Sequence, residues 1–206
     1  MAHYFDSDPT AASDRRQFEY RVNGINFRFT TDTNVFSRNG VDFGTELMIE
    51  EMIKDIKASG RIPASFLDLG CGAGIVGVVM KSVYMRCDVT GVDVNQRAVG
   101  LALENAAANG VKCNFLQSDV LQAISKDTLF DTVATNPPVR AGKKTVFAFY
   151  DQAYEHMAKN GIIYVVLQRK QGAPSTEKKL KELFGNCETL GIDGGYRVMK
   201  AVKEEI

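Results

Sequence analysis

The sequence predicts an α/β fold, a doubly wound, Rossmann-like sheet of seven mostly parallel strands with a C-terminal antiparallel hairpin and a short N-terminal β-hairpin. Short apolar runs alternate with helical patterns between residues 64 and 168, which is the order of a parallel sheet covered by helices. A glycine-rich turn follows the first run, as in nucleotide-binding sheets. An Asn-Gly or Gly-Gly pair joins two strand patterns near each end of the chain.

The elements before the sheet are a hairpin and a helix. Apolar and polar residues alternate over residues 18–29 on both sides of Asn23-Gly24, which indicates a type I′ turn between two strands. Residues 44–60 carry apolar side chains at positions 48, 49, 52, 53 and 56, which is helical spacing, and Gly60 is a stop signal.

The remaining elements follow in sequence. Strands are predicted at 64–70, 88–94, 112–119, 130–136 and 161–168, and helices at 75–84 and 96–110. Strand patterns at 187–193 and 196–202 are joined by Gly194-Gly195, which predicts a hairpin. One of the last strands must therefore run antiparallel to the others.

Length and composition indicate one globular domain in the cytoplasm. The 206 residues divide into an N-terminal extension with the β-hairpin (1–40) and a main domain (41–206). No apolar run approaches the roughly 20 residues of a membrane span, and the N-terminus lacks the pattern of a signal peptide. The four cysteines form no Cys-x-x-Cys pair, so we expect them to be reduced and mostly buried, with no metal site.

Charge is balanced overall but uneven along the chain. Residues 139–181 hold nine basic and three acidic side chains. This excess is either a solvated surface or a surface that faces a polyanion.

Carboxylates recur where three successive strands end. Asp68 precedes the glycine turn, in which Gly70, Gly72 and Gly74 let the backbone approach a ligand closely. Asp93 ends the next strand, where a carboxylate can bind the ribose hydroxyls of an adenosine. Asp119 ends the third and can accept from an adenine amino group, with Val94 and Val120 covering the ring faces. Each is also a plausible turn or cap residue, but their recurrence points to one crevice.

A fourth strand end carries Asn136-Pro137-Pro138. A residue before proline is restricted to extended geometry, so the segment is stiff before any substrate arrives. The Asn136 amide oxygen and the Pro137 carbonyl can then accept both hydrogens of a planar amino group and direct its nitrogen toward an electrophile. A methyl group on sulfur fits, because its transfer relies on alignment and needs no nucleophilic side chain. We accordingly interpret His156 as a helix residue and Cys71 as a packed residue.

With these motifs, the chain resembles the class I S-adenosylmethionine-dependent methyltransferases. Within them, it resembles the small-domain group of small-subunit ribosomal RNA guanine-N2 methyltransferases. The resemblance runs from about residue 41 to 206, through Asp42 to Thr45, "LDLGCGAG", "VDV", "QSDV" and "TNPPVRAGK". Asn-Pro-Pro is typical of enzymes that methylate planar exocyclic or amide nitrogens.

The resemblance implies a cofactor, a substrate and roles for residues. The cofactor is S-adenosylmethionine, and the substrate is RNA, with ribosomal RNA or a ribosomal particle as the partner. Catalytic roles fall on Asn136, Pro137 and Pro138. Cofactor-binding roles fall on Thr45, Asp68, Gly70, Gly72, Gly74, Asp93, Val94, Asp119, Val120 and Asn136. Substrate-binding roles fall on Phe43, Val139, Arg140, Lys143 and Lys144.

The chain departs from that group in two ways. Relatives commonly place an aromatic residue after Asn-Pro-Pro to stack on the target base, where this chain has Val139. Candidates to replace it are Phe36, Phe43, Phe147 and Tyr150. The long members of the group also carry a further N-terminal domain, for which residues 1–40 are too short.

Several functions compete. Methylation of an RNA base amino group, with guanine N2 of ribosomal RNA favoured, is the leading hypothesis. Methylation of a protein glutamine amide is the alternative, since release-factor methyltransferases also use Asn-Pro-Pro. A nicotinamide oxidoreductase leaves Asn-Pro-Pro unexplained, an inert RNA-binding module has little support, and cytosine C5 methylation lacks a cysteine near the loop. Oligomeric state is not indicated by the sequence.

Overall fold

The computed structural model describes residues 12–33, 35 and 40–204, and its main element is a seven-stranded sheet. The strands are β3 (Ser65–Leu69), β4 (Asp88–Asp93), β5 (Asn114–Gln117), β6 (Phe130–Thr135), β7 (Met157–Gln168), β8 (Glu188–Asp193) and β9 (Tyr196–Val202). Their order is β5-β4-β3-β6-β7-β9-β8, and only β9 runs in the opposite direction to the other strands. The predicted fold class is confirmed.

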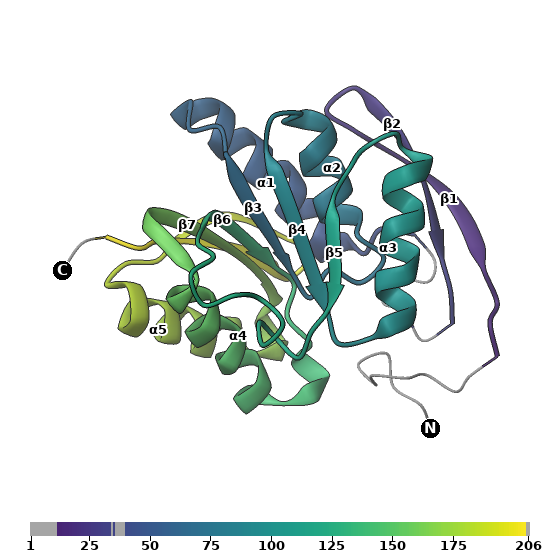
Figure 1. Ribbon diagram of the computed structural model, residues 1–206. Coiled ribbons are helices and arrows are strands. Elements are labelled where there is room, and N and C mark those ends of the chain that lie inside the picture. Colours follow the sequence, from purple (N-terminus) through teal and green to yellow (C-terminus); the bar gives the residue numbers. More distant parts are fainter. Residues whose placement is uncertain (1–11, 34, 36–39, 205–206) are drawn as a thin grey trace.

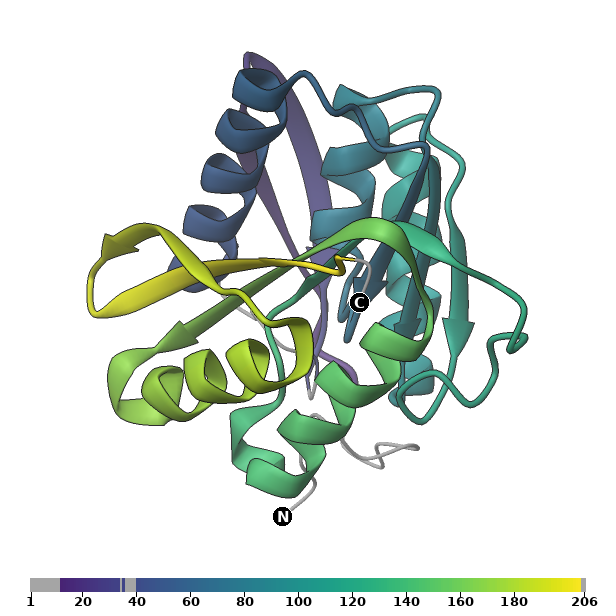
Figure 2. The ribbon, with the colours of Figure 1, turned by 90° about the vertical axis from the view of Figure 1, so that its left-hand side faces the viewer.

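Helices cover both faces of this sheet (Figure 1). They are α1 (Phe43–Ser59), α2 (Ile75–Val83), α3 (Gln96–Ala108), α4 (Lys143–Glu155) and α5 (Ala173–Phe184), with short 3₁₀ turns η1 (Val139–Ala141) and η2 (Arg169–Gln171). The apolar side chains of α1, α2 and α3 form one buried cluster with one face of the sheet, and those of α4 and α5 form a second cluster with the other face. Figure 2 shows α4 and α5 side by side in their own layer.

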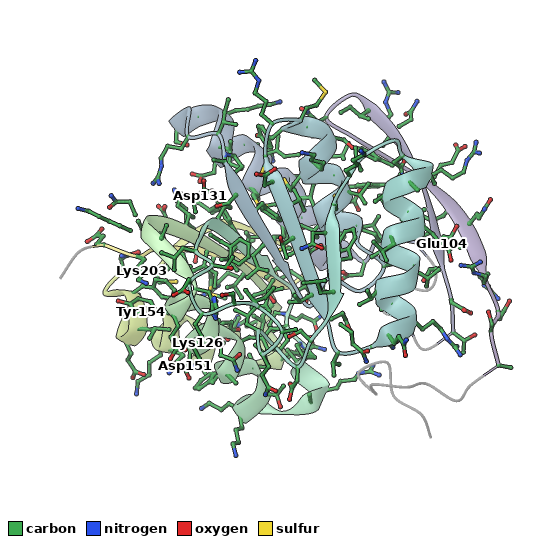
Figure 3. The ribbon with its side chains drawn as sticks, viewed as in Figure 1. Glu104, Lys126, Asp131, Asp151, Tyr154 and Lys203 are labelled. Atoms are coloured by element: carbon green, nitrogen blue, oxygen red, sulfur yellow. The ribbon has the colours of Figure 1, made fainter. Side chains whose placement is uncertain are left out.

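The N-terminal hairpin adds an outer layer. Strands β1 (Arg16–Val22) and β2 (Ile25–Thr31) pair antiparallel around Asn23 and Gly24, whose φ values of 52° and 78° are those of a type I′ turn. Phe27 and Phe29 are buried in the same apolar cluster as α1. Arg15 forms an ion pair with Glu104, which is labelled on α3 in Figure 3. The hairpin therefore shares the main core, and the division at residue 40 stays a prediction.

The C-terminal hairpin has the predicted glycine turn, with φ values of 53° at Gly194 and 80° at Gly195. Beyond the hairpin, the Lys203 ammonium donates to the carbonyl oxygen of Tyr154 at 2.7 Å and lies over its ring at 4.6 Å (Figure 3). This interaction ties the end of the sheet to α4.

One boundary in the second half of the chain differs from the prediction. His156 caps the end of α4 and is not inside a helix, because β7 begins at Met157, four residues before the apolar run. Asn160, with φ 59°, lies within an irregularity in the pairing with β6 that a search for apolar runs does not detect. The buried His156 ring contacts the Thr128 carbonyl oxygen at 3.0 Å.

Other expectations concern membranes, metals and cysteines. None of the described helices is long and apolar enough to cross a membrane. All four cysteines are free thiols, with Cys71 and Cys87 buried and Cys113 and Cys187 half-buried. Among residues 12–33, 35 and 40–204, no three His, Cys, Asp or Glu side chains are placed to hold a metal ion.

Candidate active site

The carboxyl ends of the central strands open on one cavity of about 640 Å³. Figure 1 shows the arrowheads of β3, β4 and β5 ending at the same edge of the sheet. Most of the predicted site residues line this cavity, namely Gly70, Gly72, Asp93, Val94, Asp119, Val120, Asn136, Pro137, Pro138, Val139 and Arg140. Four loops from different strands thus converge as the sequence predicts.

The other predicted residues lie outside this cavity. Thr45 and Asp68 line a small adjoining cavity of about 40 Å³, which Asn136 shares. Phe43, Lys143 and Lys144 line neither, and all three are exposed. Gly74 also lines neither: a Cβ there would lie 2.7 Å from the Ala102 Cβ, so this glycine permits close packing of the turn against α3.

Asp93 joins the glycine turn to the end of β4. One carboxylate oxygen accepts from the Gly72 amide and the other from the Asn95 amide, each at 2.9 Å. Burial raises the pKa of this carboxyl group, although the backbone donors favour its charged form. A carboxylate has about four acceptor sites, so Asp93 can still accept a hydroxyl donor from a ligand in the cavity.

Asp68 lies beneath the turn. Its carboxylate accepts from the Gly77 amide in the first turn of α2 at 2.8 Å. Burial raises its pKa to about 7, the Gly77 bond opposes this shift, and the negative charge of Asp93 adds to it. Asp68 therefore supports the start of α2 and is partly protonated near neutral pH.

We expect Asp68→Asn to flatten the pH dependence of stability. Because the folded-state pKa is above the unfolded-state value, the contribution of Asp68 to stability is fully present below pH about 4 and is lost as the pH rises through about 7. Asparagine accepts from Gly77 without ionising. Urea unfolding should show that the free energy of unfolding falls between pH 5 and pH 8 by about 2–3 kcal/mol more in the wild type than in the variant. Equal decreases in the two proteins would refute the shift, and Asp88→Asn at the exposed start of β4 is the control.

Asn136 is held by two residues from the start of α1. Its amide nitrogen donates to the Asp42 carboxylate at 3.1 Å and to the Thr45 hydroxyl at 3.0 Å. Asp42 is also the N-cap of α1, accepting from the amides of Gly44 and Thr45, and the Thr45 hydroxyl donates to it. The Asn136 amide nitrogen is thus turned toward the start of α1, where its two neighbouring acceptors share one N–H direction, and the Asn136 carbonyl oxygen is left as an acceptor for a ligand.

The two prolines shape the next turn. Pro138 has φ −74° and ψ 78°, and the Val139 amide donates to the Pro137 carbonyl oxygen at 2.8 Å, which is an inverse γ-turn. The ring of proline favours this φ, so Pro138 stabilises the turn. The sequence predicts that the Pro137 carbonyl oxygen accepts from a ligand. One of its two lone pairs accepts from the Val139 amide, and the other remains for that ligand.

The proposed stacking aromatics occupy different places. Tyr150 is fully buried, with its hydroxyl 3.1 Å from the Thr176 hydroxyl. The Phe147 ring lies under the Lys143 ammonium at 5.0 Å and lines neither cavity. Phe43 is 44% exposed and packs against Tyr196. Phe36 lies outside the described residues.

Sequence reasoning missed several residues of the site, including three with polar side chains. Tyr196 and Ser118 line the main cavity, and Asp42 lines it while holding Asn136. Asp42 carries a usable signal, since Asp followed by Thr three residues later before an apolar helix is a capping pattern. Tyr196 carries none, because its place at the cavity depends on the pairing of β9 with β7.

Cys71 offers no nucleophile to the site. Burial and the charges of Asp68 and Asp93 raise the pKa of its thiol far above its ordinary value. A neutral thiol is a poor nucleophile. The site therefore presents acceptors and positioning contacts.

The model of one family, the methyltransferase small domain, matches residues 26–200. The chain belongs to this family. The methyltransferase small domain begins within β2 and includes both cavities, so the predicted identity as an S-adenosylmethionine-dependent methyltransferase is confirmed.

The relatives of this methyltransferase domain include a protein of similar length and proteins about twice as long. The chain is 37% identical to the uncharacterized protein YbxB of Bacillus subtilis strain 168 over 98% of both chains. It is 30% identical to ribosomal RNA small subunit methyltransferase C of Aliivibrio salmonicida over 82% of this chain and 48% of that one. In fold, it matches the T. thermophilus 16S rRNA N2 G1207 methyltransferase in complex with AdoMet and guanosine. That match has a TM-score of 0.84 and 29% identity, covering 95% of this chain and 52% of that one. The chain thus spans about half the length of these ribosomal RNA methyltransferases.

The cavity suits S-adenosylmethionine, the cofactor of this methyltransferase. Its volume lies in the range of small-molecule sites. Gly70 and Gly72, with φ values of 77° and 53°, present backbone without a side chain to the cavity. The half-buried Asp93 carboxylate retains acceptor capacity for a hydroxyl donor, and Val94 and Val120 add apolar walls.

Proposed function

We propose that this protein methylates an exocyclic amino nitrogen of a nucleobase in RNA, with guanine N2 of ribosomal RNA as the target. The observation that carries this proposal is the orientation of Asn136. Asp42 and Thr45 hold its amide nitrogen, which leaves its oxygen as the acceptor for a substrate amino group. An acceptor of fixed direction suits an amino group that must present its nitrogen to a methyl donor.

The residues of the chain then have distinct roles. S-adenosylmethionine supplies a methyl group on a sulfonium. Asp93, Asp119 and the glycine turn bind and orient the cofactor, while Asn136 orients the target amino group. No side chain needs to act as a nucleophile, which agrees with the neutral Cys71 thiol. The relatives that act on ribosomal RNA support the choice of substrate.

Methylation of a protein glutamine amide is the second candidate, because a glutamine –NH₂ would meet the same acceptor. The charge beside Asn136 favours RNA. Arg140 lines the cavity and Lys143 and Lys144 begin the adjoining helix, all exposed. Such cations suit the phosphates around a base that has left its stack.

The direct test uses purified protein with methyl-labelled S-adenosylmethionine. Ribosomal RNA and ribosomal subunits from cells that lack the protein are the substrates, and nucleosides are separated after digestion. We expect the label in N2-methylguanosine. Label in glutamine of ribosomal or release-factor proteins, with none in RNA, would support the second candidate.

We expect Arg140→Ala, Lys143→Ala and Lys144→Ala together to raise the KM for RNA severalfold and to reduce its dependence on salt. The slope of log affinity against log salt should fall by about one counterion for each phosphate that the variant no longer neutralises. Cofactor affinity should change little, since only Arg140 lines the cavity. The measurement is KM for RNA at several salt concentrations.

A matched variant separates local charge from net charge. Arg61, Arg86 and Lys112 are exposed cations just before the amino ends of β3, β4 and β5, at the opposite edge of the sheet. Their replacement by Ala should leave KM and the salt slope unchanged. Equal effects of the two triple variants would show that the cations beside Asn136 do not contact RNA.

A further inference from the structure

Two aromatic side chains line the main cavity within the described part of the chain, Phe149 and Tyr196. Phe149 belongs to the cofactor side: a Cβ on Gly70 would lie 3.1 Å from the Phe149 ring. Tyr196, the first residue of β9, belongs to the Asn136 side. It lies near Asp42, because a Cβ on Gly44 would contact both the Tyr196 ring and, at 3.3 Å, an Asp42 carboxylate oxygen. Asp42 in turn binds Asn136.

The Tyr196 ring is fixed by its neighbours. A Cβ on Gly44 would lie 2.6 Å from two ring carbons, so the ring occupies space that only glycine leaves open. The Phe43 ring packs against Tyr196 with centroids 5.8 Å apart. A Cβ on Gly194 would lie 2.6 Å from the Phe43 ring, so a second glycine makes room for the supporting ring.

The backbone beneath Tyr196 is also held. Tyr196 pairs with Gln168 on β7, and the Arg169 amide donates to the Gly195 carbonyl oxygen at 2.8 Å. An aromatic ring already fixed on a strand loses little conformational entropy when a second ring stacks on it. Val139, next to the prolines, is half-buried and has no ring to offer.

We propose that Tyr196, supported by Phe43, is the surface on which the target nucleobase stacks while Asn136 holds its amino group. This proposal rests on the proposed function and adds the residue that recognises the base as a flat ring. It places the base between β9 and the Asn-Pro-Pro turn. Stacking on an aromatic ring discriminates little between bases, because every base has a flat face. Tyr196 therefore supplies affinity, and Asn136 selects the amino group.

The chain contains no tryptophan, so Tyr196→Trp introduces a single tryptophan at the proposed surface, whose emission can be excited apart from that of the tyrosines. Stacking of guanine on an indole quenches its emission. Guanosine is titrated into the variant with saturating S-adenosylhomocysteine, and ribose 5-phosphate serves as the ligand without a base. Phe147→Trp, outside both cavities, is the matched control. We expect saturable quenching by guanosine at position 196 and none at position 147.

Kinetics provides the second readout. Tyr196→Ala should raise the KM for RNA about tenfold, in line with the usual contribution of one base-aromatic stack. Tyr196→Phe should restore KM to within about twofold, because the proposal requires the ring and not the hydroxyl. Affinity for S-adenosylhomocysteine should stay unchanged in both variants.

The outcomes separate this proposal from the proposed function. Absent quenching at position 196, equal quenching at both positions, or a wild-type KM in Tyr196→Ala would overturn the stacking role while RNA methylation stands. Label found only in protein glutamine would overturn the RNA function. Saturable quenching at position 196 would then still support a base-stacking site.

Discussion

Asn136→Ala should lower the rate of methyl transfer a hundredfold or more while the affinity for S-adenosylmethionine stays within a few fold. The amide oxygen is the acceptor that orients the target amino group, and removing such an interaction costs about 3 kcal/mol of the activation barrier. The backbone should hold, because Pro137 and Pro138 fix the turn independently. Single-turnover kinetics and cofactor calorimetry measure the two quantities separately.

Two companion variants sharpen this result. Asn136→Asp keeps an oxygen at the position but replaces the donating –NH₂ beside the Asp42 carboxylate, so we expect it to be inactive as well. Asn114→Ala, at the exposed start of β5, should behave as wild type. A parallel loss of cofactor affinity and rate in Asn136→Ala would instead assign Asn136 to the cofactor site.

Asp93→Ala should weaken S-adenosylmethionine binding by about 1–3 kcal/mol, the usual cost of removing one partner of a buried hydrogen bond. Two effects add. The cofactor loses an acceptor, and the amides of Gly72 and Asn95 lose the carboxylate that holds the glycine turn. Calorimetry with S-adenosylhomocysteine measures the change in affinity, and circular dichroism reports the fold.

The control lies on the same strand. Asp88 lies at the exposed opposite end of β4, and the Asp88→Ala variant should keep wild-type affinity for S-adenosylhomocysteine. Asp93→Asn keeps one acceptor and should lose less than Asp93→Ala. Unchanged affinity in a folded Asp93→Ala protein would place the ribose elsewhere.

Local patterns were enough to predict the elements that form this site. Alternation around Asn23-Gly24, the apolar spacing of α1 and the glycine turn each depend on residues close in sequence, and all three appear as expected. The strand ends were predictable too, because parallel connections place successive carboxyl ends on one edge. Asp93, Asp119 and Asn136 therefore meet at one cavity.

Interactions between distant segments were not predictable in the same way. Asp42 reaches Asn136 across 94 residues, and Tyr196 reaches the cavity only because β9 is inserted between β7 and β8. Val120 takes φ 51°, which a β-branched residue rarely adopts, and no sequence pattern predicts it. Gly74 illustrates the reverse: its place in the motif suggested ligand contact, yet it packs against Ala102.

The most direct test of the central claim is nucleoside mass spectrometry of ribosomal RNA from cells that lack the protein. We predict that one N2-methylguanosine disappears, returns with the wild-type gene and fails to return with Asn136→Ala. An unchanged set of modified nucleosides in the absence of the protein would contradict the account, as would full restoration by Asn136→Ala.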